Sequence, residues 1–119
     1  MSEEKFDAII VGGGMAGATA AYILANAGME VLLADRGDYC GAKNVTGGRL
    51  YAHSMEKVFP GFAKEAPVER LVTKEKVSLM TEKGSLDIGY SSTDLGADPD
   101  GASYTVLRSK FDQWMAENR

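Results

Sequence analysis

The sequence predicts an α/β fold, the N-terminal portion of a doubly wound domain with an inserted antiparallel β-hairpin. Three observations carry this prediction. A short apolar run, a glycine-rich turn and an alanine-rich segment open the chain in the order strand, turn, helix. A second apolar run follows and ends on an acidic residue. Further along, two alternating runs flank a Lys-Gly turn, which is typical of a hairpin.

Composition limits the class of protein. The chain has 119 residues, enough for one domain, and 17 acidic residues against 13 basic ones give a net charge of −4. This balance, without a basic cluster, argues against nucleic-acid binding. The single cysteine, Cys40, has no partner for a disulfide, which indicates a cytoplasmic protein. The first apolar run is too short for a signal or transmembrane segment.

The first 35 residues predict a β-α-β unit. Residues 6–11 are apolar and rich in β-branched side chains, as in a strand covered on both faces. Residues 15–27 are good helix formers, and Gly28 stands where a left-handed C-terminal cap belongs. Residues 30–35 form the second apolar strand.

The middle of the chain alternates between loop, helix and hairpin. Residues 36–48 contain four glycines without a hydrophobic period, which predicts a long loop that covers a ligand. Residues 50–59 suit a short helix that ends at a Pro-Gly pair. Residues 68–81 and 85–90 alternate between apolar and polar side chains and predict the two strands of the hairpin.

The last 25 residues predict a turn, a strand and a helix. Residues 95–102 are rich in turn formers, and residues 104–107 read as a strand. Ser109 is placed to cap a final helix, with Asp112 at the capping-box position. One face of that helix is apolar: Phe111, Trp114 and Met115. Because a two-stranded parallel sheet is too small to bury both faces, we expect residues 1–119 to be the N-terminal part of a truncated domain.

The glycine-rich turn carries the chemistry. Its pattern, Gly12-x-Gly14-x-x-Gly17, lies between the predicted strand and helix. The first glycine permits the tight turn, the second lets the backbone approach a pyrophosphate, and the third allows the helix to pack closely on the strand. The free N–H groups at the helix N-terminus favour the same anion. The turn therefore predicts dinucleotide binding.

The end of the second strand predicts a ribose contact. Asp35 lies close to the spacing expected of the acid that accepts hydrogen bonds from the adenosine ribose. The neighbouring Arg36 is also compatible with a 2′-phosphate. These residues alone do not separate FAD from NAD.

A longer pattern resembles one flavoprotein family. The run Lys-Asn-x-Thr-Gly-Gly-Arg-Leu-Tyr at residues 43–51 is more specific than the glycine pattern. Together with residues 6–35, 60–70 and 104–112, it resembles the Fix-type electron transfer flavoprotein-quinone oxidoreductases, which are related to the geranylgeranyl reductases. The resemblance spans nearly the whole chain. It implies a Rossmann-like domain with FAD as cofactor.

The resemblance also implies site residues. A first group would hold the FAD pyrophosphate: Gly12, Gly13, Gly14, Met15, Ala16 and Gly17. Asp35 and Arg36 would lie at the adenosine ribose, and Lys43, Gly47 and Gly48 near the flavin. Arg108 would reach the backbone of FAD, with a structural ion pair to Asp112 as the alternative. A loop lysine such as Lys43 is more often solvated surface, which is the alternative for this residue. Neither a catalytic residue nor a metal site is assigned.

The function implied by the resemblance is electron transfer. FAD would accept electrons from an electron transfer flavoprotein and pass them toward a quinone, with a ferredoxin-like subunit as a further partner. Such an enzyme would be cytoplasmic, and peripheral at the inner membrane when intact. Two alternatives remain open: a related FAD-dependent reductase or hydroxylase of an organic substrate, and a non-catalytic nucleotide-binding fragment.

Overall fold

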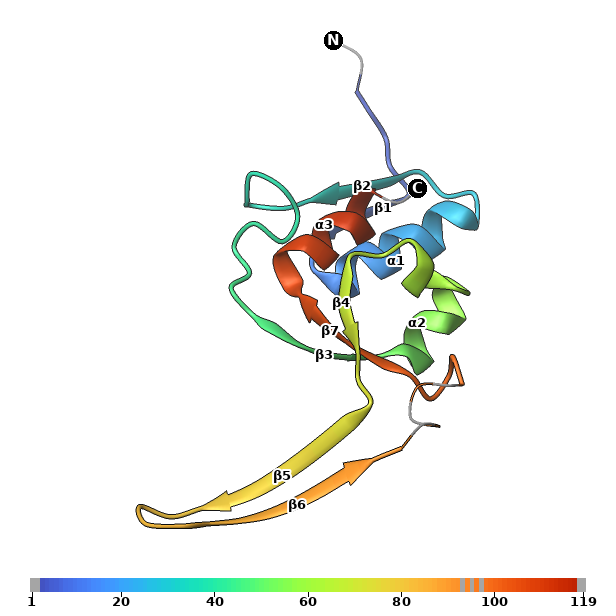
Figure 1. Ribbon diagram of the computed structural model, residues 1–119. Coiled ribbons are helices and arrows are strands. Elements are labelled where there is room, and N and C mark those ends of the chain that lie inside the picture. Colours follow the sequence, from blue (N-terminus) through green and yellow to red (C-terminus); the bar gives the residue numbers. More distant parts are fainter. Residues whose placement is uncertain (1–2, 93, 95, 97, 118–119) are drawn as a thin grey trace.

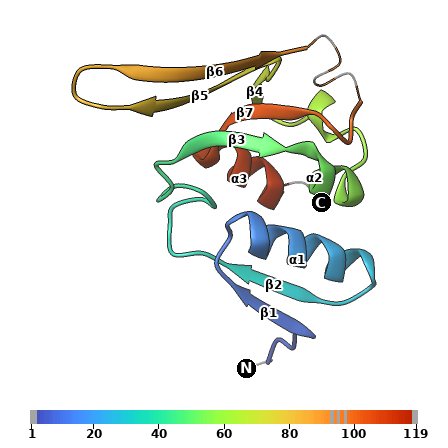
Figure 2. The ribbon, with the colours of Figure 1, turned by 90° about the horizontal axis from the view of Figure 1, so that it is seen from below.

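The computed structural model describes residues 3–92, 94, 96 and 98–117, and its elements form stacked layers (Figures 1 and 2). Three helices lie between a parallel pair of strands and an antiparallel sheet, and a hairpin extends from the far side of that sheet. The strands are β1 (Ala8–Val11), β2 (Val31–Ala34), β3 (Gly47–Tyr51), β4 (Val68–Leu71), β5 (Lys74–Met80), β6 (Ser85–Ser91) and β7 (Ser103–Leu107). The helices are α1 (Met15–Asn26), α2 (Ala52–Val58), α3 (Arg108–Glu117) and a 3₁₀ turn at Phe62–Lys64.

The predicted β-α-β unit is confirmed. β1 and β2 pair in parallel, with Ala8 opposite Val31 and Val11 opposite Ala34. After α1, Gly28 adopts a φ of +88°, and its N–H donates to the carbonyl of Ala25. This left-handed residue ends the helix as the sequence predicts, because glycine lacks the Cβ that disfavours such a φ.

The parallel pair is covered on one face, so the prediction of strands covered on both faces is wrong for the described residues. α1 packs on the face of the pair that includes Ile10. On the other face, Ile9 and Val11 are 64% and 86% exposed, and Leu32 is 39% exposed. The apolar side chains of β1 therefore lie on both the face that packs against α1 and the exposed face.

The antiparallel sheet has the order β3-β7-β4 and revises two predicted boundaries. The predicted loop 36–48 ends two residues early, because Gly47 and Gly48 pair with Leu107 and Val106 in β3. The predicted helix 50–59 begins later, at Ala52, since Leu50 belongs to the strand. The sequence did not predict the start of β3, because glycine is uncommon in strands and Gly47 and Gly48 give no alternating apolar pattern.

The predicted strand 68–81 is two strands with different partners. β4 pairs with β7, whereas β5 pairs with β6 and forms the hairpin. The N–H of Val72 donates to the carbonyl of Ser103 at 2.9 Å, and beyond this point the chain leaves the sheet. The hairpin is confirmed, but it starts at Lys74 and stands away from the rest of the molecule (Figure 1).

The junction of β7 and α3 corrects the predicted cap. The helix begins at Arg108, directly after the strand, so Ser109 lies inside it. Asp112 does not complete a capping box; its carboxylate accepts hydrogen bonds from the Arg108 guanidinium, one helical turn earlier. Of the turn predicted at 95–102, positions 95 and 97 lie outside the described residues, and residues 98–101 form a turn.

The core lies between the helices and the antiparallel sheet. Phe111 and Met115 are fully buried, which confirms the apolar face predicted for α3. Aromatic rings continue this face: the ring centroids of Phe59 and Trp114 are 5.6 Å apart, and those of Tyr22 and Phe59 are 4.0 Å apart. The packing fixes α1 against α3, and so places the start of α1 beside the chain that follows β2.

Candidate dinucleotide site

The glycine-rich turn between β1 and α1 has little room for side chains. Gly12 adopts a φ of +109°, in the region that favours glycine. A Cβ on Gly17 would lie 1.9 Å from the carbonyl oxygen of Gly12 and 3.3 Å from a methyl carbon of Ile10. The first glycine therefore permits the turn and the third lets α1 approach β1, as the spacing predicts.

Gly14 differs from these neighbours because it faces open space. A Cβ there would meet nothing within 4 Å, although the residue is the N-cap of α1. No side chain caps the helix, and no acidic residue lies in its first turn. The first N–H groups of α1, from Met15 onward, are thus available to an anion beside a backbone without a side chain.

Asp35 ties the turn to the loop after β2. Its Oδ1 accepts a hydrogen bond from the N–H of Gly13, and its Oδ2 accepts one from the N–H of Gly37, both at 2.9 Å. These two amides hold the pKa of the Asp35 carboxyl below its ordinary value. The carboxylate stays ionised at neutral pH, and each oxygen keeps a lone pair for a further donor such as a ribose hydroxyl.

Cys40 lies beneath the same turn. A Cβ on Gly13 would be 2.2 Å from the Cys40 sulfur, so the thiol lies directly against the buried Gly13 backbone. Burial, followed by the negative charges of Asp35, Asp112 and Glu117, raises the pKa of the thiol. Cys40 is therefore a protonated packing group at neutral pH.

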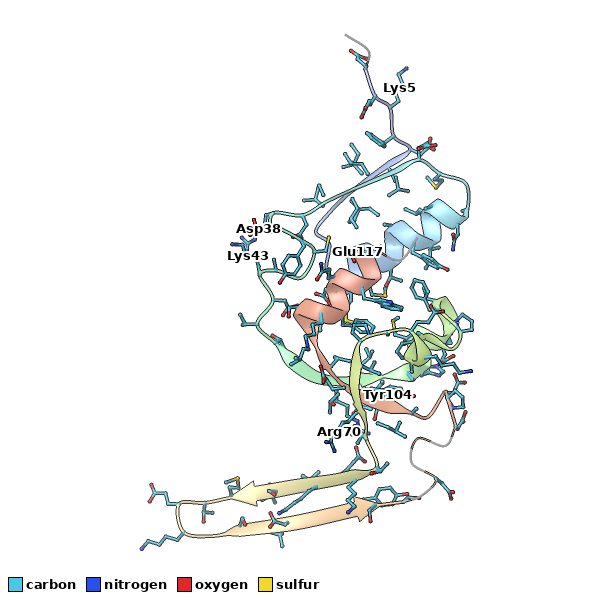
Figure 3. All side chains as sticks on the ribbon, turned by 45° about the horizontal axis from the view of Figure 1, so that its top comes forward. Lys5, Asp38, Lys43, Arg70, Tyr104 and Glu117 are labelled. Atoms are coloured by element: carbon cyan, nitrogen blue, oxygen red, sulfur yellow. The ribbon has the colours of Figure 1, made fainter. Side chains whose placement is uncertain are left out.

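A cleft of about 260 Å³ brings several predicted residues together. Gly14, Asp35, Arg36 and Lys43 line it, together with Gly41, Asn44 and Asp112. Figure 3 shows Lys43 on the loop that follows β2, with its side chain toward the outside of the loop. The cleft therefore combines free helix amides, two cationic side chains and two carboxylates, those of Asp35 and Asp112. The amides and cations suit a diphosphate, and the carboxylate of Asp35 suits a ribose hydroxyl.

The remaining predicted residues lie elsewhere. Gly47 and Gly48 are exposed residues of β3 and do not line this cleft. The Arg108 Nε lies 2.9 Å from Asp112 Oδ1, so the predicted alternative, a structural ion pair, is the arrangement found. Arg49 is also engaged: its guanidinium pairs with Glu75 and donates to the hydroxyl of Ser103.

Sequence reasoning missed two participants. It assigned Cys40 no structural role and named Asn44 only as part of the run 43–51, without a contact, although both contact residues around the cleft. Their signal was weak, because a lone cysteine and a lone asparagine in a loop carry no spacing that predicts a contact. Only the fold brings them to the turn and to α3.

The residues present fit FAD. The pyrophosphate would accept hydrogen bonds from the amides of Gly14, Met15 and Ala16. The ribose would donate to the carboxylate of Asp35, which the N–H groups of Gly13 and Gly37 already orient. Among the described residues, no group of three or more potential metal ligands is found. None of the described helices is long and apolar enough to cross a membrane.

The fold and the cleft define a dinucleotide-binding α/β protein. Residues 7–115 match the FAD dependent oxidoreductase family, and the chain belongs to this family. FAD is accordingly its cofactor, as the sequence predicts.

Relatives with known names support the finer resemblance. The chain is 58% identical over 117 residues to Protein FixC of Escherichia coli O157:H7, and 52% identical over 117 residues to the probable electron transfer flavoprotein-quinone oxidoreductase YdiS of Escherichia coli K12. Each alignment covers 98% of this chain and 27% of the relative. The predicted resemblance to the Fix-type family is confirmed, and the chain spans about a quarter of the length of these relatives.

A solved structure supports the fold. The myxobacterial chondrochloren halogenase CndH, described as a variant of the FAD-dependent halogenases, superposes with a TM-score of 0.72 at 25% sequence identity. The match covers 98% of this chain and 26% of the halogenase. The predicted α/β, Rossmann-like class is therefore confirmed.

Proposed function

We propose that this chain carries the nucleotide-binding part of an FAD-dependent oxidoreductase that passes electrons from an electron transfer flavoprotein toward a quinone. The observation that carries the nucleotide-binding part is the cleft at Gly14, where uncapped helix amides, Asp35 and two cations meet. The name of the relative YdiS supports the electron donor and acceptor. As in the sequence-based interpretation, residues 1–119 form the N-terminal part of the FAD domain.

The chain's own residues would bind and orient the cofactor. Gly12, Gly13 and Gly17 shape the turn, the amides after Gly14 hold the pyrophosphate, and Asp35 holds the adenosine ribose. Arg36 and Lys43 add positive charge to the same cleft. When bound, FAD supplies the redox chemistry, since it accepts and releases electrons that no side chain here can carry.

Gly47, Gly48 and Arg108 keep a subordinate role in this proposal. Because Gly47 and Gly48 have no side chains, the backbone is accessible at the start of β3, just after the loop that contains Lys43. This accessible backbone suits an approach of the flavin end of FAD. The guanidinium of Arg108 is already paired with Asp112, which lines the cleft. Arg108 would therefore act on the cofactor indirectly, by holding Asp112 in the wall of the cleft.

The proposed partners are those that the resemblance to the Fix-type family implies. The name of the relative YdiS supports two of them, the electron transfer flavoprotein and the quinone. An electron transfer flavoprotein as donor, a ferredoxin-like subunit as a further component and a quinone as acceptor are proposed for the longer protein, at the surface of the inner membrane. A second candidate, an FAD-dependent enzyme that acts on an organic substrate, is favoured by the structural likeness to the halogenase. The higher identity to the Fix-type relatives supports the first candidate more strongly than the second.

Titration with FAD tests the binding part. We expect quenching of flavin fluorescence that ADP reverses by competition, with a dissociation constant weaker than about 1 µM, because the cleft holds the ADP half of FAD. Absence of quenching at millimolar protein would contradict the site. Stopped-flow reduction of the longer protein by a reduced electron transfer flavoprotein, compared with reduction by NAD(P)H, tests the donor.

A further inference from the structure

The loop between β2 and β3 is held against α3 by one buried carboxylate, that of Asp112. This side chain is 1% exposed, and its oxygens accept hydrogen bonds from two directions. Arg108 donates from its own helix, at 2.9 and 3.2 Å, and Asn44 donates from the loop at 3.1 Å. A buried carboxylate needs all such donors, because an unpaired charge away from water is costly.

The backbone of the loop reinforces this contact. Gly41 adopts a φ of +95°, and a Cβ there would lie 2.8 Å from the Asp112 Cβ and 2.8 Å from the carbonyl oxygen of Ser109. Further along, the N–H of Arg108 donates to the carbonyl of Thr46 at 2.9 Å. The loop is therefore attached to α3 on both sides of Lys43.

The same loop forms a wall of the cleft. Lys43 lies between Gly41 and Asn44 in the chain, and it lines the same cleft as Gly14 and Asp112. At its other end, the loop places Cys40 against Gly13. A change in the contact between the loop and α3 would therefore move both the Lys43 side chain and Cys40, which packs against the glycine-rich turn.

We propose that Asp112 and Asn44 form a latch that positions the loop of residues 40–46, and with it Lys43, over the dinucleotide cleft. The inference rests on the proposed FAD site, but the latch itself exists without the cofactor. Asp112 and Asn44 are positioning residues, because they act through the loop and through Lys43.

The test uses Asn44→Ala, which removes the donor on the loop and leaves the Arg108–Asp112 ion pair in place. Because the Asn44 Oδ1 also accepts a hydrogen bond from the N–H of Thr46 at 3.2 Å, the Thr46 amide is left out of the comparison. The matched control is Asn26→Ala, at the exposed end of α1. Hydrogen exchange of the ligand-free protein is measured first. We expect protection of the amides of residues 41–45 to fall about tenfold in Asn44→Ala alone, and to fall further than protection of the amides of α1.

Affinity for FAD is then measured on the same proteins. We expect the dissociation constant to rise about fivefold in Asn44→Ala and to stay unchanged in Asn26→Ala. Unchanged hydrogen exchange in Asn44→Ala would overturn the latch, whether or not the protein binds FAD. Lost protection with unchanged affinity would overturn its positioning role. Failure of the unaltered protein to bind FAD would refute the proposed function. Hydrogen exchange would still test the latch in that case, because it is measured on the ligand-free protein.

Discussion

The glycine-rich turn and the β5–β6 hairpin both join short apolar runs, yet different contacts hold them. In the turn, Gly13 and Gly17 lie so close to buried atoms that an added Cβ would come within 2.2 Å of one. In the hairpin, Gly84 and Gly89 have no neighbour closer than 3.9 Å to an added Cβ. The turn is specified by steric fit within the chain, whereas the hairpin is specified by its own strand pairing.

The hairpin has one apolar face that the described residues leave uncovered. Register places Val77 opposite Ile88 and Leu79 opposite Leu86, and all four side chains are more than 60% exposed. The other face is polar, with an ion pair between Lys76 and Asp87 at 3.3 Å. An isolated two-stranded hairpin is only marginally stable in water. The comparison therefore separates a region that depends on tight fit from one that tolerates change.

The largest effect is expected from Gly17→Ala. The new Cβ would collide with the Gly12 carbonyl, which belongs to the backbone and has no freedom to turn aside. We expect a loss of about 3 kcal/mol in the free energy of unfolding, measured by urea denaturation. The control is Gly89→Ala in β6, where the added methyl meets only the carbonyl oxygen of Glu75 at 3.9 Å, an ordinary van der Waals contact, and the change should stay within about 0.5 kcal/mol. Equal losses in both variants would remove the distinction between the two regions.

A second substitution separates binding from folding inside the turn. Gly14→Val places its side chain in open space, so the unfolding free energy should change little, but it fills the position reserved for the diphosphate. We expect FAD affinity to fall at least about tenfold in a fluorescence titration, with an unchanged circular dichroism spectrum. Retained affinity would show that the phosphates bind elsewhere.

How far the sequence predicts the molecule depends on the range of the contacts. The β-α-β unit follows from local patterns, since the turn, the helix and the Gly28 cap each depend on neighbours in the chain. The cofactor follows from the glycine spacing together with the resemblance. For these parts, local propensity and tertiary structure agree.

The parts that sequence reasoning missed depend on distant partners. Gly47 and Gly48 become strand only because β7, some 60 residues later, pairs with them. Asp112 has the spacing of a capping box, yet it is buried against Asn44, 68 positions away. No periodicity within one segment reports such contacts, so the residues of the latch were outside the reach of pattern analysis.

The third prediction concerns pH and the link between the turn and the loop. Because the amides of Gly13 and Gly37 lower the pKa of Asp35, its ionised form stabilises the folded state above the ordinary aspartate value of 3.8. That contribution is lost as the pH falls through the lower folded pKa. Asp35→Asn should therefore be less stable than the unaltered protein at pH 7, and the difference should vanish in strong acid. A difference that does not begin to shrink as the pH falls below 3.8 would mean that the carboxylate charge is not its source.

The smallest effect is expected in the hairpin, from Val77→Thr. Valine and threonine have nearly the same shape and both favour strands, so the exchange tests only the burial of a hydroxyl group. At Val77, which is 66% exposed, the hydroxyl stays in water and the unfolding free energy should change by less than about 0.5 kcal/mol. The matched control is Val106→Thr in β7, which is 4% exposed and should lose about 2 kcal/mol because its hydroxyl enters the core. A loss at Val77 as large as that at Val106 would mean that the apolar face of the hairpin is buried in solution, and the hairpin would then depend on fit as the glycine-rich turn does.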